Sequence, residues 1–399
     1  MDKKKIFLSG MLSGMIAIIL ANTLYHAGMF LYGRTIGYEI PVSKKIDEIF
    51  SILDDHFVED YDKEFLIETM YYGLVDGIGD RYTTYMDRET LGRFLEQTEG
   101  SYVGIGLYAS VDETDNRIYV MPFDGSPAQK AGILPRDKII KVNGYEVNGN
   151  TLEDAVSMMK GKEGTSVTIT VFRQSANQNL DFEVVREKID VPTVTHEMVN
   201  DEIGYLRISN FERVTYKQFL SAYEDLRSQQ MKGLIIDVRN NPGGLLDVVG
   251  SIADELMPEG VIVYTEDKRG NREYLRSDSK KSIDIPLVIL VNENSASASE
   301  VLSGAIKDTG IGTLVGTQTY GKGLVQNLYF LPDNSGVKVT IAKYYTPNGI
   351  SIHGIGLKPD YVVEMSNELS GRISTLELEE DVQLIKAIEV MNNKLVVAR

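Results

Sequence analysis

Apolar residues recur with two different periods along the chain, and these periods predict its secondary structure. Just beyond residue 40 they recur every three or four positions, as on one face of an amphipathic helix. Two short helices are predicted here, Ile46–Phe57 and Leu66–Ile78, and a third runs from Asp87 to about Gln97. Residues 40–98 are therefore expected to form a small helical segment, in which no chemistry is visible.

The next segment, residues 99–188, mixes short alternating runs with glycine-rich turns, which is typical of strands joined by tight loops. A strand is predicted at Tyr102–Ala109. After it we expect a strand, a short helix, a strand ending in a turn, a longer helix and a final strand. These lie at Arg117–Met121, Gly125–Gly132, Lys138–Gly144, Leu152–Met159 and Ser166–Phe172.

Residues 189–365 contain two runs that are too apolar for an edge strand, Gly233–Val238 and Ile285–Val291. Each is followed by a loop and then by a helix, at Leu245–Leu256 and from about Ser297 to Lys307. This repetition predicts parallel strands with helical crossovers, and in such sheets sites form at the carboxyl ends of the strands. The two loops are expected to meet there.

The pattern before and after this repeat adds further elements. A strand and a helix precede it, three strands with one hairpin turn follow it, and a helical tail that packs back closes the chain. They are predicted at Ile203–Ile208, Thr215–Gln229, Thr313–Val315, Gly323–Phe330 and Gly336–Tyr344, with the turn at Asp333–Gly336, and at Ser374–Val397. The fold class is α/β, multidomain, with a mixed sheet in the largest region.

The N-terminus carries an uncharged run, Ile6 to Gly33, directly after three lysines. It is long enough to cross a bilayer as a tilted helix. Lysines on its near side predict that the rest of the chain lies outside the cytoplasm. Secretion after signal cleavage is the alternative, but the position three before a cut at Ala21 or Ala27 would not be small. A single membrane anchor is therefore favoured.

Composition narrows the possible partners and chemistry. The formal net charge of −17 disfavours nucleic-acid binding, which depends on clustered Lys and Arg. The chain has no cysteine, so disulfides, cysteine nucleophiles and thiolate metal sites are ruled out. Its four histidines are scattered and show neither metal-ligand spacing nor an obvious carboxylate partner. No metal and no cofactor are predicted.

Two short segments hold the strongest candidates for chemistry, and each has a simpler interpretation. Ser297, with Glu300 three residues later, stands where a helix is predicted to start, which is also a capping-box pattern. Lys322 follows Gly316 at the spacing of a phosphate-binding loop, which would make the protein an ATPase. However, Gly323 replaces the Ser or Thr that binds magnesium, and a strand follows instead of a helix.

In the segment 99–188 the order of elements and the motifs resemble a PDZ domain. Ser126-Pro-Ala and Asp137-Lys-Ile-Ile match the middle of such domains, although Arg136 stands where many have glycine. Gly104-Ile-Gly-Leu107 stands where they hold the carboxylate-binding loop. The resemblance implies that this loop binds a peptide's C-terminal carboxylate through backbone N–H groups while the peptide adds as a strand. The residues concerned are Gly104, Ile105, Gly106 and Leu107.

Four further motifs, which follow the PDZ-like segment, resemble those of the carboxy-terminal processing peptidases, also called tail-specific proteases. They are Gly233-Leu-Ile-Ile-Asp-Val-Arg-Asn-Asn-Pro-Gly-Gly244, Asn292-Glu-Asn-Ser-Ala-Ser-Ala-Ser-Glu300, Gly321-Lys-Gly-Leu-Val-Gln326 and Tyr345-Thr-Pro-Asn-Gly-Ile-Ser-Ile352. The resemblance implies that Ser297 is the nucleophile, Lys322 the general base and Gln326 the residue that orients the lysine. The backbone N–H groups of Gly243 and Ala298 would form the oxyanion hole.

The implied chemistry is consistent with the residue types. A lysine holds its proton at neutral pH unless burial or a local field lowers its pKa. The neutral amide of Gln326 can hydrogen-bond the amine without stabilising the ammonium, whereas Glu in its place would raise the pKa of Lys322. Gly321 and Gly323, on either side of Lys322, permit close packing around its stem.

The expected protein is a serine endopeptidase that cleaves proteins near their C-termini, with the substrate tail bound by the PDZ domain. Its partners are proteins with accessible C-termini, the membrane through its anchor, and a second copy if the helical ends dimerise. A non-catalytic membrane adaptor is the competing class. The expected parts are an anchor or signal segment (1–39), a helical segment (40–98), a PDZ domain (99–188), a protease core (189–365) and a C-terminal helical segment (366–399).

Overall fold

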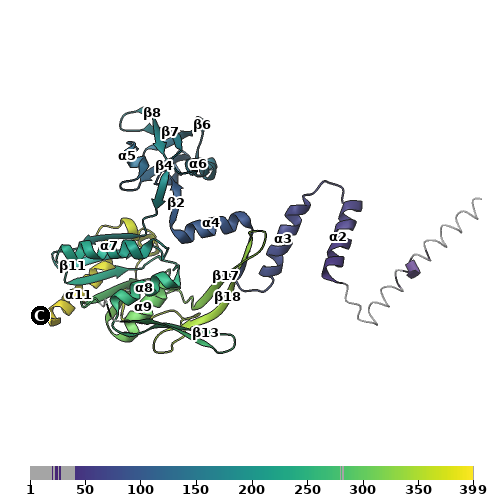
Figure 1. Cartoon of the computed structure of the whole chain (residues 1–399). Helices are drawn as coiled ribbons and strands as arrows, with labels where there is room; N and C mark the ends of the chain where they lie inside the picture. The colour runs from purple at the N-terminus through teal and green to yellow at the C-terminus, as the bar shows by residue number, and fades with distance from the viewer. Residues whose placement is uncertain are drawn as a thin grey trace, which may run out of the picture. The chain divides into compact units, whose positions relative to one another are not determined.

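The structure is a computed structural model that describes residues 20, 23–25, 27, 41–278, 280 and 283–398. The chain forms two compact units, residues 1–67 and 68–399, each taken by itself below (Figure 1). The predicted anchor, Ile6 to Gly33, lies almost entirely outside the described residues. Among the residues that are described, no helix is both long enough and apolar enough to cross a membrane.

The first unit contains the helix α2 (Val42–His56) and the start of α3 (Lys63–Asp76), close to the two helices that periodicity predicted. Lys63 Nζ lies 3.7 Å from Asp54 Oδ2 and 4.5 Å above the centre of the Phe50 ring. The Tyr61 hydroxyl donates a hydrogen bond to the same aspartate. No residue of α2 is buried, so these polar contacts at the helix ends hold the turn between the helices.

The central sheet of the predicted protease region has the strand order β10-β11-β12-β15-β16-β19. Within this sheet β11, β12, β15, β16 and β19 run parallel to one another, and β10 is antiparallel to β11. The strands are β10 (Val194–Met198), β11 (Ile203–Ile208), β12 (Gly233–Asp237), β15 (Leu287–Val291), β16 (Gly312–Gly316) and β19 (Tyr361–Val362). The sheet is mixed, as expected.

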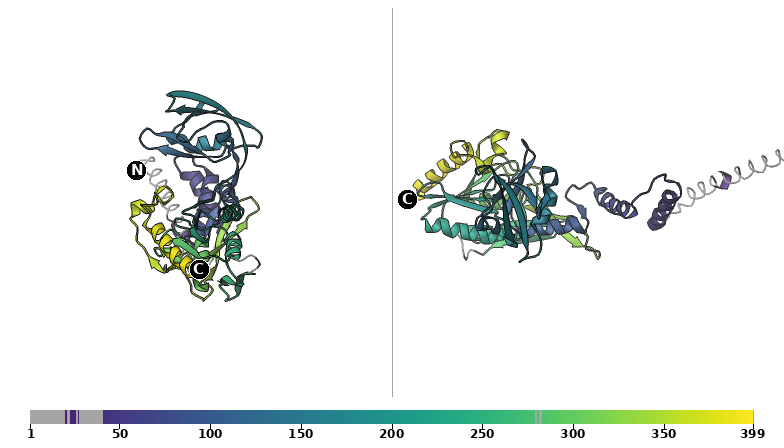
Figure 2. Two further views of the ribbon diagram at one scale, coloured as in Figure 1. Left: turned by 90° about the vertical axis from the view of Figure 1, so that its left-hand side faces the viewer. Right: turned by 90° about the horizontal axis from the view of Figure 1, so that it is seen from above.

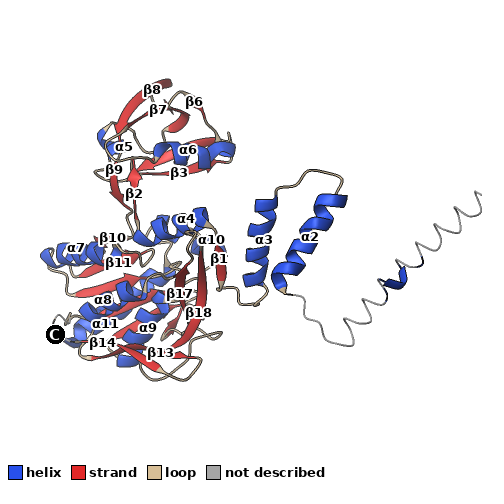
Figure 3. Cartoon of the chain, turned by 45° about the vertical axis from the view of Figure 1, so that its right-hand side comes forward, coloured by secondary structure: helices blue, strands red, loops and turns tan. Residues whose placement is uncertain are grey.

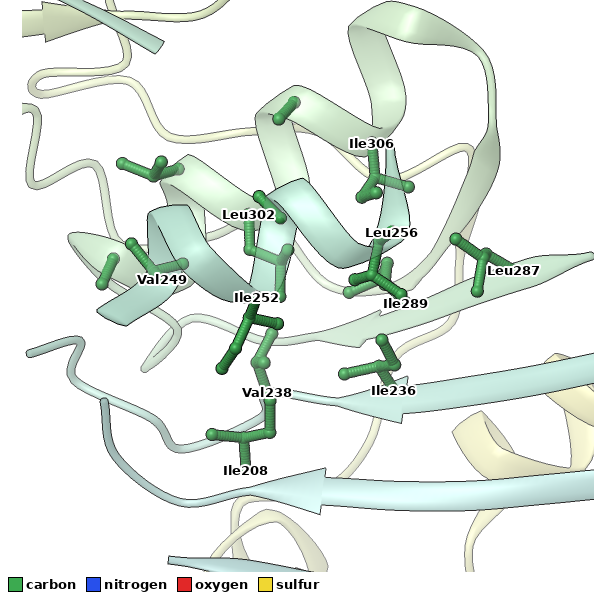
Figure 4. Close-up of a cluster of buried hydrophobic side chains, with 14 of the residues drawn as sticks. Ile208, Ile236, Val238, Val249, Ile252, Leu256, Leu287, Ile289, Leu302 and Ile306 are labelled. Carbon is green, nitrogen blue, oxygen red and sulfur yellow. The ribbon is translucent and has the colours of Figure 1, made fainter. Parts of the chain in front are cut away.

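Helices cover both faces of this sheet. Because successive residues of a strand point to opposite faces, Leu234 and Ile236 of β12 pack with α7 (Thr215–Ser228), α8 (Leu246–Leu256) and α9 (Ala298–Thr309). Figure 4 shows part of this cluster, between the strands and the helices α8 and α9. Ile235, on the other face, packs with α11 (Val382–Ala398), which Figure 2 shows in yellow. Burial on both faces explains why β12 and β15 are continuous apolar runs.

A second sheet, drawn in red with the first in Figure 3, brings the lysine segment to the edge of the core. Its strands are β1 (Thr84–Met86), β13 (Gly260–Asp267), β14 (Arg272–Ser277), β17 (Leu324–Phe330) and β18 (Gly336–Tyr345). The hairpin of β17 and β18 was predicted, and the turn closes with a hydrogen bond from Leu331 N to Ser335 O of 2.9 Å. Strands β13 and β14 were not predicted.

The segment that resembles a PDZ domain contains a sheet with the order β3-β4-β5-β7-β8, with β6 paired to β5. The elements are β3 (Leu107–Asp112), β4 (Arg117–Pro122), α5 (Pro127–Lys130), β5 (Lys138–Val142), β6 (Tyr145–Glu146), α6 (Leu152–Met159), β7 (Ser166–Arg173) and β8 (Gln178–Val185). Arg136, at the position where glycine is common, has φ +68°, so it adopts the left-handed conformation that glycine would take more easily.

Two predicted elements differ from those observed. The single strand expected at Tyr102–Ala109 is split into β2 (Ser101–Gly104), which pairs with β9 (Glu187–Asp190), and β3, because Gly106 has φ +74° and bends the chain. The tail helix begins eight residues later than predicted, at Val382. Asp381 Oδ1 accepts a hydrogen bond from Leu384 N (2.9 Å) and so caps α11 at that point.

Candidate active site

The predicted nucleophile, Ser297, lies on the loop from β15 to α9 and is the residue immediately before the helix. Its backbone has φ 54° and ψ −113°, an unusual conformation for a residue with a side chain. One hydrogen bond of the predicted capping box is present, because Ser297 N donates to Glu300 Oε2 at 2.9 Å. The Ser297 hydroxyl lies near the hydroxyl of Tyr344 on β18, where it opposes the rise that burial causes in the pKa of that phenol.

The predicted oxyanion loop follows β12 and lies directly against the serine. Gly243 has φ +110°, and a Cβ atom there would lie 2.7 Å from Ser297 Cβ and 3.0 Å from Ala298 N. Only glycine allows this close approach, and it places Gly243 beside the first residue of α9. The Gly243 N–H donates to Asn241 Oδ1 at 2.8 Å.

Lys322 lies two residues before β17, and its side chain is partly buried. Its Nζ atom is 4.8 Å above the centre of the Tyr82 ring. The flanking glycines pack against backbone instead of against the lysine stem. A Cβ on Gly323 would lie 2.6 Å from His353 N, and one on Gly321 would lie 2.9 Å from Gly356 N. The glycines therefore hold the lysine segment against residues 353–356.

Gln326 lies on strand β17, after Lys322 in the chain. The pairing of β17 with β18 is irregular between Val325 and Gln326. An irregularity of this kind changes the direction of a side chain. The Nε2 atom of Gln326 is buried, and it has no hydrogen-bond partner within the described part of the chain.

These residues meet at one cavity of about 460 Å³. Helix α4 (Arg88–Glu99), which sequence analysis left without chemistry, forms part of its wall. The predicted site residues among those lining it are Ser297, Lys322, Gln326, Gly243 and Ala298. Over the ranges that the structure describes, Lys322 Nζ forms no hydrogen bond to Ser297 or Gln326 and no ion pair. The serine and the lysine thus share a cavity, and each lies near a tyrosine.

The sequence matches three family models. Peptidase family S41 matches residues 202–363, the PDZ domain matches residues 124–173, and the activating protease CtpB N-terminal domain matches residues 34–90. A carboxy-terminal-processing protease of Bartonella bacilliformis is 37% identical over 327 residues, which are 80% of this chain and 74% of that protein. The chain belongs to peptidase family S41.

Within the S41 family it is a carboxy-terminal processing serine protease with a PDZ domain. The carboxy-terminal processing protease CtpA of Bacillus subtilis is 36% identical over 323 residues, 80% of this chain and 69% of that protein. The solved structure of an S41 protease from Bacteroides fragilis has the same fold at 14% identity, with a TM-score of 0.52 over 79% of this chain and 87% of that chain.

One residue of the S41 protease joins the serine loop to the lysine loop. Glu300 is fully buried, and its carboxylate accepts hydrogen bonds from both loops. The donors are Ser297 N (2.9 Å), Thr319 Oγ1 (2.6 Å), Gly321 N (2.7 Å) and Lys322 N (2.9 Å). Sequence analysis found Glu300 as a helix-start residue, but a contact 22 positions along the chain gives no local signal.

Electrostatics favours the neutral form of Lys322. Burial lowers the pKa of Lys322, and the nearby cations Lys338 and Arg81 lower it further, while Glu300 opposes the shift. Burial also lowers the pKa of Lys338, which lines the same cavity. In contrast, burial raises the pKa of Tyr344, so the phenol beside Ser297 keeps its proton.

Two aromatic residues at the site were missed by sequence analysis. Tyr344 is buried, lies near Ser297, and donates a hydrogen bond to the Lys322 carbonyl oxygen. Tyr82 lies under the lysine amine. Both belong to strands or loops far from the serine in sequence, and single aromatic residues carry no motif.

The histidine analysis needs one correction. His196 has no obvious carboxylate partner in the sequence, but its Nε2 lies 2.9 Å from Asp225 Oδ2. The pair joins β10 to α7 and does not line the cavity. Throughout the described residues, no group of three or more His, Cys, Asp or Glu side chains is arranged to hold a metal ion.

Proposed function

We propose that this protease cleaves protein substrates near their C-terminal ends with Ser297 as nucleophile and Lys322 as general base. The observation that carries the proposal is the environment of Lys322. Its amine lies in the same cavity as a serine hydroxyl, forms no ion pair within the described ranges, and has a lowered pKa. A lysine that can lose its proton next to a serine is the requirement for this type of catalysis.

In the proposed reaction, the neutral Lys322 amine takes the proton of Ser297 as Oγ attacks the scissile carbonyl. The oxygen of the tetrahedral intermediate receives hydrogen bonds from the N–H groups of Gly243 and Ala298. The Lys322 ammonium then returns the proton to the leaving amine, which leaves an acyl-enzyme. Water attacks the ester in the second half with Lys322 again as the base, and Ser297 recovers its proton.

The contacts of the resting side chains define what must change before this reaction. The Lys322 amine must leave the Tyr82 ring and reach the Ser297 hydroxyl. The Gly243 N–H, which now bonds Asn241 Oδ1, must turn to the oxyanion. We propose that Gln326 orients the amine once it has moved, because its side chain lines the same cavity and its Nε2, a hydrogen-bond donor, has no partner among the described residues.

The PDZ domain is proposed to bind the substrate's C-terminal carboxylate at Gly104, Ile105, Gly106 and Leu107. This loop links β2 to β3. The proposed partners are proteins with accessible C-termini and, through the helical ends, a second copy of the chain. The segment boundaries 1–39, 40–98, 99–188, 189–365 and 366–399 stay part of this proposal.

We further propose that the N-terminal run Ile6 to Gly33 anchors the protease with its catalytic part outside the cytoplasm, because lysines precede an uncharged run of spanning length. The test is fractionation of cells that express the full chain. Intact protein in the membrane pellet supports the anchor, whereas a soluble form that begins near Asn22 to Gly28 would show secretion after signal cleavage.

The reaction itself is tested by mapping cuts. The full chain in detergent is incubated with an unfolded protein that has an apolar C-terminus, and mass spectrometry identifies the products. We expect cleavage near the C-terminal end, and none by the Ser297→Ala variant. Equal product from parent and variant would contradict Ser297 as nucleophile, and no product from either would favour the adaptor alternative.

A further inference from the structure

A second lysine, Lys338, lies on the wall of the cavity that holds Ser297. It belongs to strand β18, and its backbone is paired on both sides, with Thr84 of β1 and with Leu328 of β17. The Lys338 Nζ atom lies 5.3 Å above the centre of the Phe94 ring of α4, a favourable cation–π distance. The paired backbone and the ring together fix the place at which the amine meets the cavity.

The Lys338 amine forms no ion pair and no hydrogen bond within the described part of the chain. The cavity is lined by two further ionisable residues, Lys322 and Glu212. Lys322 can carry only the same charge. The Glu212 carboxylate accepts a hydrogen bond from Asn210 Nδ2 (3.2 Å), and its Oε2 is buried so close to Gly100 that a Cβ there would lie 2.5 Å away. The Lys338 cation therefore faces the cavity without a carboxylate from the described residues.

An unpaired ammonium group is unfavourable in these surroundings. Many of the other residues that line the cavity are apolar, among them Leu95, Phe211, Leu245 and Leu324. Burial lowers the pKa of Lys338, because less water is available to stabilise its charge. A carboxylate supplied by a ligand would stabilise that charge, and a charge pair in a partly dry cavity is stronger than one on the surface. The cavity wall therefore favours a ligand with an anionic group at this point.

The ligand of this cavity is a polypeptide if Ser297 is the nucleophile, so the role of Lys338 rests on the proposed function. The carboxylates of a polypeptide are the side chains of Asp and Glu and its C-terminus. We propose that Lys338 binds a substrate carboxylate in the cleavage cavity and makes the protease prefer substrates with an acidic group at one position relative to the scissile bond. A single position is expected because Phe94 and the β18 backbone fix the amine.

The test scans one glutamate along a peptide substrate. The peptide is otherwise neutral and apolar and ends in an amide, and each Glu peptide has a partner with Gln at the same position. The full chain in detergent cleaves both peptides, and liquid chromatography gives kcat/KM for each. Lys338 also lowers the pKa of Lys322. This effect belongs to the free enzyme and cancels in the Glu-to-Gln ratio of kcat/KM at one pH, which is therefore the quantity compared.

At one position we expect the parent protein to show a Glu-to-Gln ratio of about threefold to thirtyfold, mainly through a lower KM. Lys338→Met keeps an unbranched side chain over the Phe94 ring but removes the charge, so it should bring the ratio to about one. Lys338→Arg should keep the ratio above one, and Lys338→Glu should bring it below one. Lys343→Met, at an exposed position on the same strand, is the control and should keep the ratio of the parent.

A reversed preference in Lys338→Glu cannot come from damage to the fold, because a damaged cavity would slow both peptides. A preference for Glu that persists in Lys338→Met would overturn the role of Lys338, since another group would then bind the carboxylate. Cleavage of the peptides by Ser297→Ala at the rate of the parent would instead contradict the proposed function itself.

The same assay separates the two sources of the carboxylate. A neutral peptide with a free C-terminal carboxylate is shortened by one residue at a time. If the terminal carboxylate binds Lys338, kcat/KM should rise at one length, and the rise should disappear in Lys338→Met. If only an acidic side chain binds, the glutamate scan alone should show a preference. No preference in either series, while cleavage still depends on Ser297, would overturn the role of Lys338 and leave the proposed function standing.

Discussion

Arg239 and Lys322 are both cations inside the protease core, but their surroundings are opposite. The Arg239 side chain is fully buried, and its guanidinium contacts Asp237 Oδ2 at 2.6 Å and Asp381 Oδ2 at 2.7 Å. Although burial opposes the shift, these carboxylates raise the pKa of Arg239 well above its ordinary value. Lys322 is only partly buried and faces an aromatic ring, and its pKa is lowered.

The difference shows how the protease separates structure from chemistry. Arg239 ties the end of β12 to Asp381, which caps α11, so the loop that carries Gly243 starts from a fixed point. A cation with two carboxylate partners keeps its charge and cannot act as a base. Lys322 has no such partner among the described residues, and it is therefore the cation that can give up its proton.

The largest effect is expected when Lys322 is made unable to lose its proton. Lys322→Arg keeps a positive charge but replaces the amine by a guanidinium, which does not deprotonate in proteins. We expect kcat/KM for an unfolded substrate to fall by roughly 10⁴-fold or more, as it should for Lys322→Ala. Circular dichroism checks that both variants fold. Turnover within tenfold of the parent in either variant would contradict the proposal that Lys322 is the general base.

The partnered cation should matter for stability instead. Arg239→Met leaves Asp237 and Asp381 buried without their counter-charge, and breaking such a network costs about 3–5 kcal/mol of unfolding free energy. Urea unfolding measures the loss. Arg93→Met is the control, because Arg93 pairs with Glu89 at 3.3 Å on the surface, where a pair is worth at most about 1 kcal/mol. Similar losses in the two variants would contradict the structural role of Arg239.

A carboxylate placed near Lys322 should raise the pKa of this lysine, as the neighbouring carboxylates raise that of Arg239. Gln326→Glu places a negative charge on the same cavity wall and raises the pKa of Lys322. Since the reaction needs the neutral amine, the acid limb of the pH profile of kcat/KM should move to higher pH, and activity at neutral pH should fall roughly tenfold to a hundredfold. Recovery at alkaline pH separates this effect from damage. Gln326→Leu should lose activity without moving the limb.

The smallest effect is expected from a neighbouring charge. Lys338 helps to lower the pKa of Lys322, so Lys338→Met should raise that pKa and move the acid limb in the same direction by less. A loss of about twofold to tenfold at neutral pH is expected. Lys343→Met, at an exposed position on the same strand, is the control. A shift of the limb to lower pH in Lys338→Met would contradict the assigned sign.

The parts of the molecule that depend on local pattern were predictable from the sequence. Strands β12 and β15 are apolar because both of their faces are buried, and a glycine-rich or serine loop follows each. The hairpin of β17 and β18 has a local turn signal. Strands β13 and β14 also have such a signal, because β13 is rich in β-branched and aromatic residues and Gly270, with φ +82°, lies in the turn after it, so sequence analysis should have predicted this hairpin.

The contacts of the site were less predictable than its motifs. Ser297, Lys322, Gln326, Gly243 and Ala298 came from motif resemblance, and the sheet brings them to one cavity. The partners Tyr344 and Tyr82 come from strands and loops whose approach depends on tertiary packing. The role of Glu300 was predictable only in part. Its place in a capping box is a local pattern, whereas its hydrogen bonds to residues 319–322 depend on tertiary packing.

The four hydrogen bonds of Glu300 also determine the stage of folding at which the serine and lysine segments come together. The carboxylate can hold the serine and lysine segments together only after the second half of the core, through Lys322, has reached its place beside α9. A nascent or half-folded chain therefore has the proposed nucleophile without the proposed base. The proposed site is therefore complete only once the core has folded as far as Lys322.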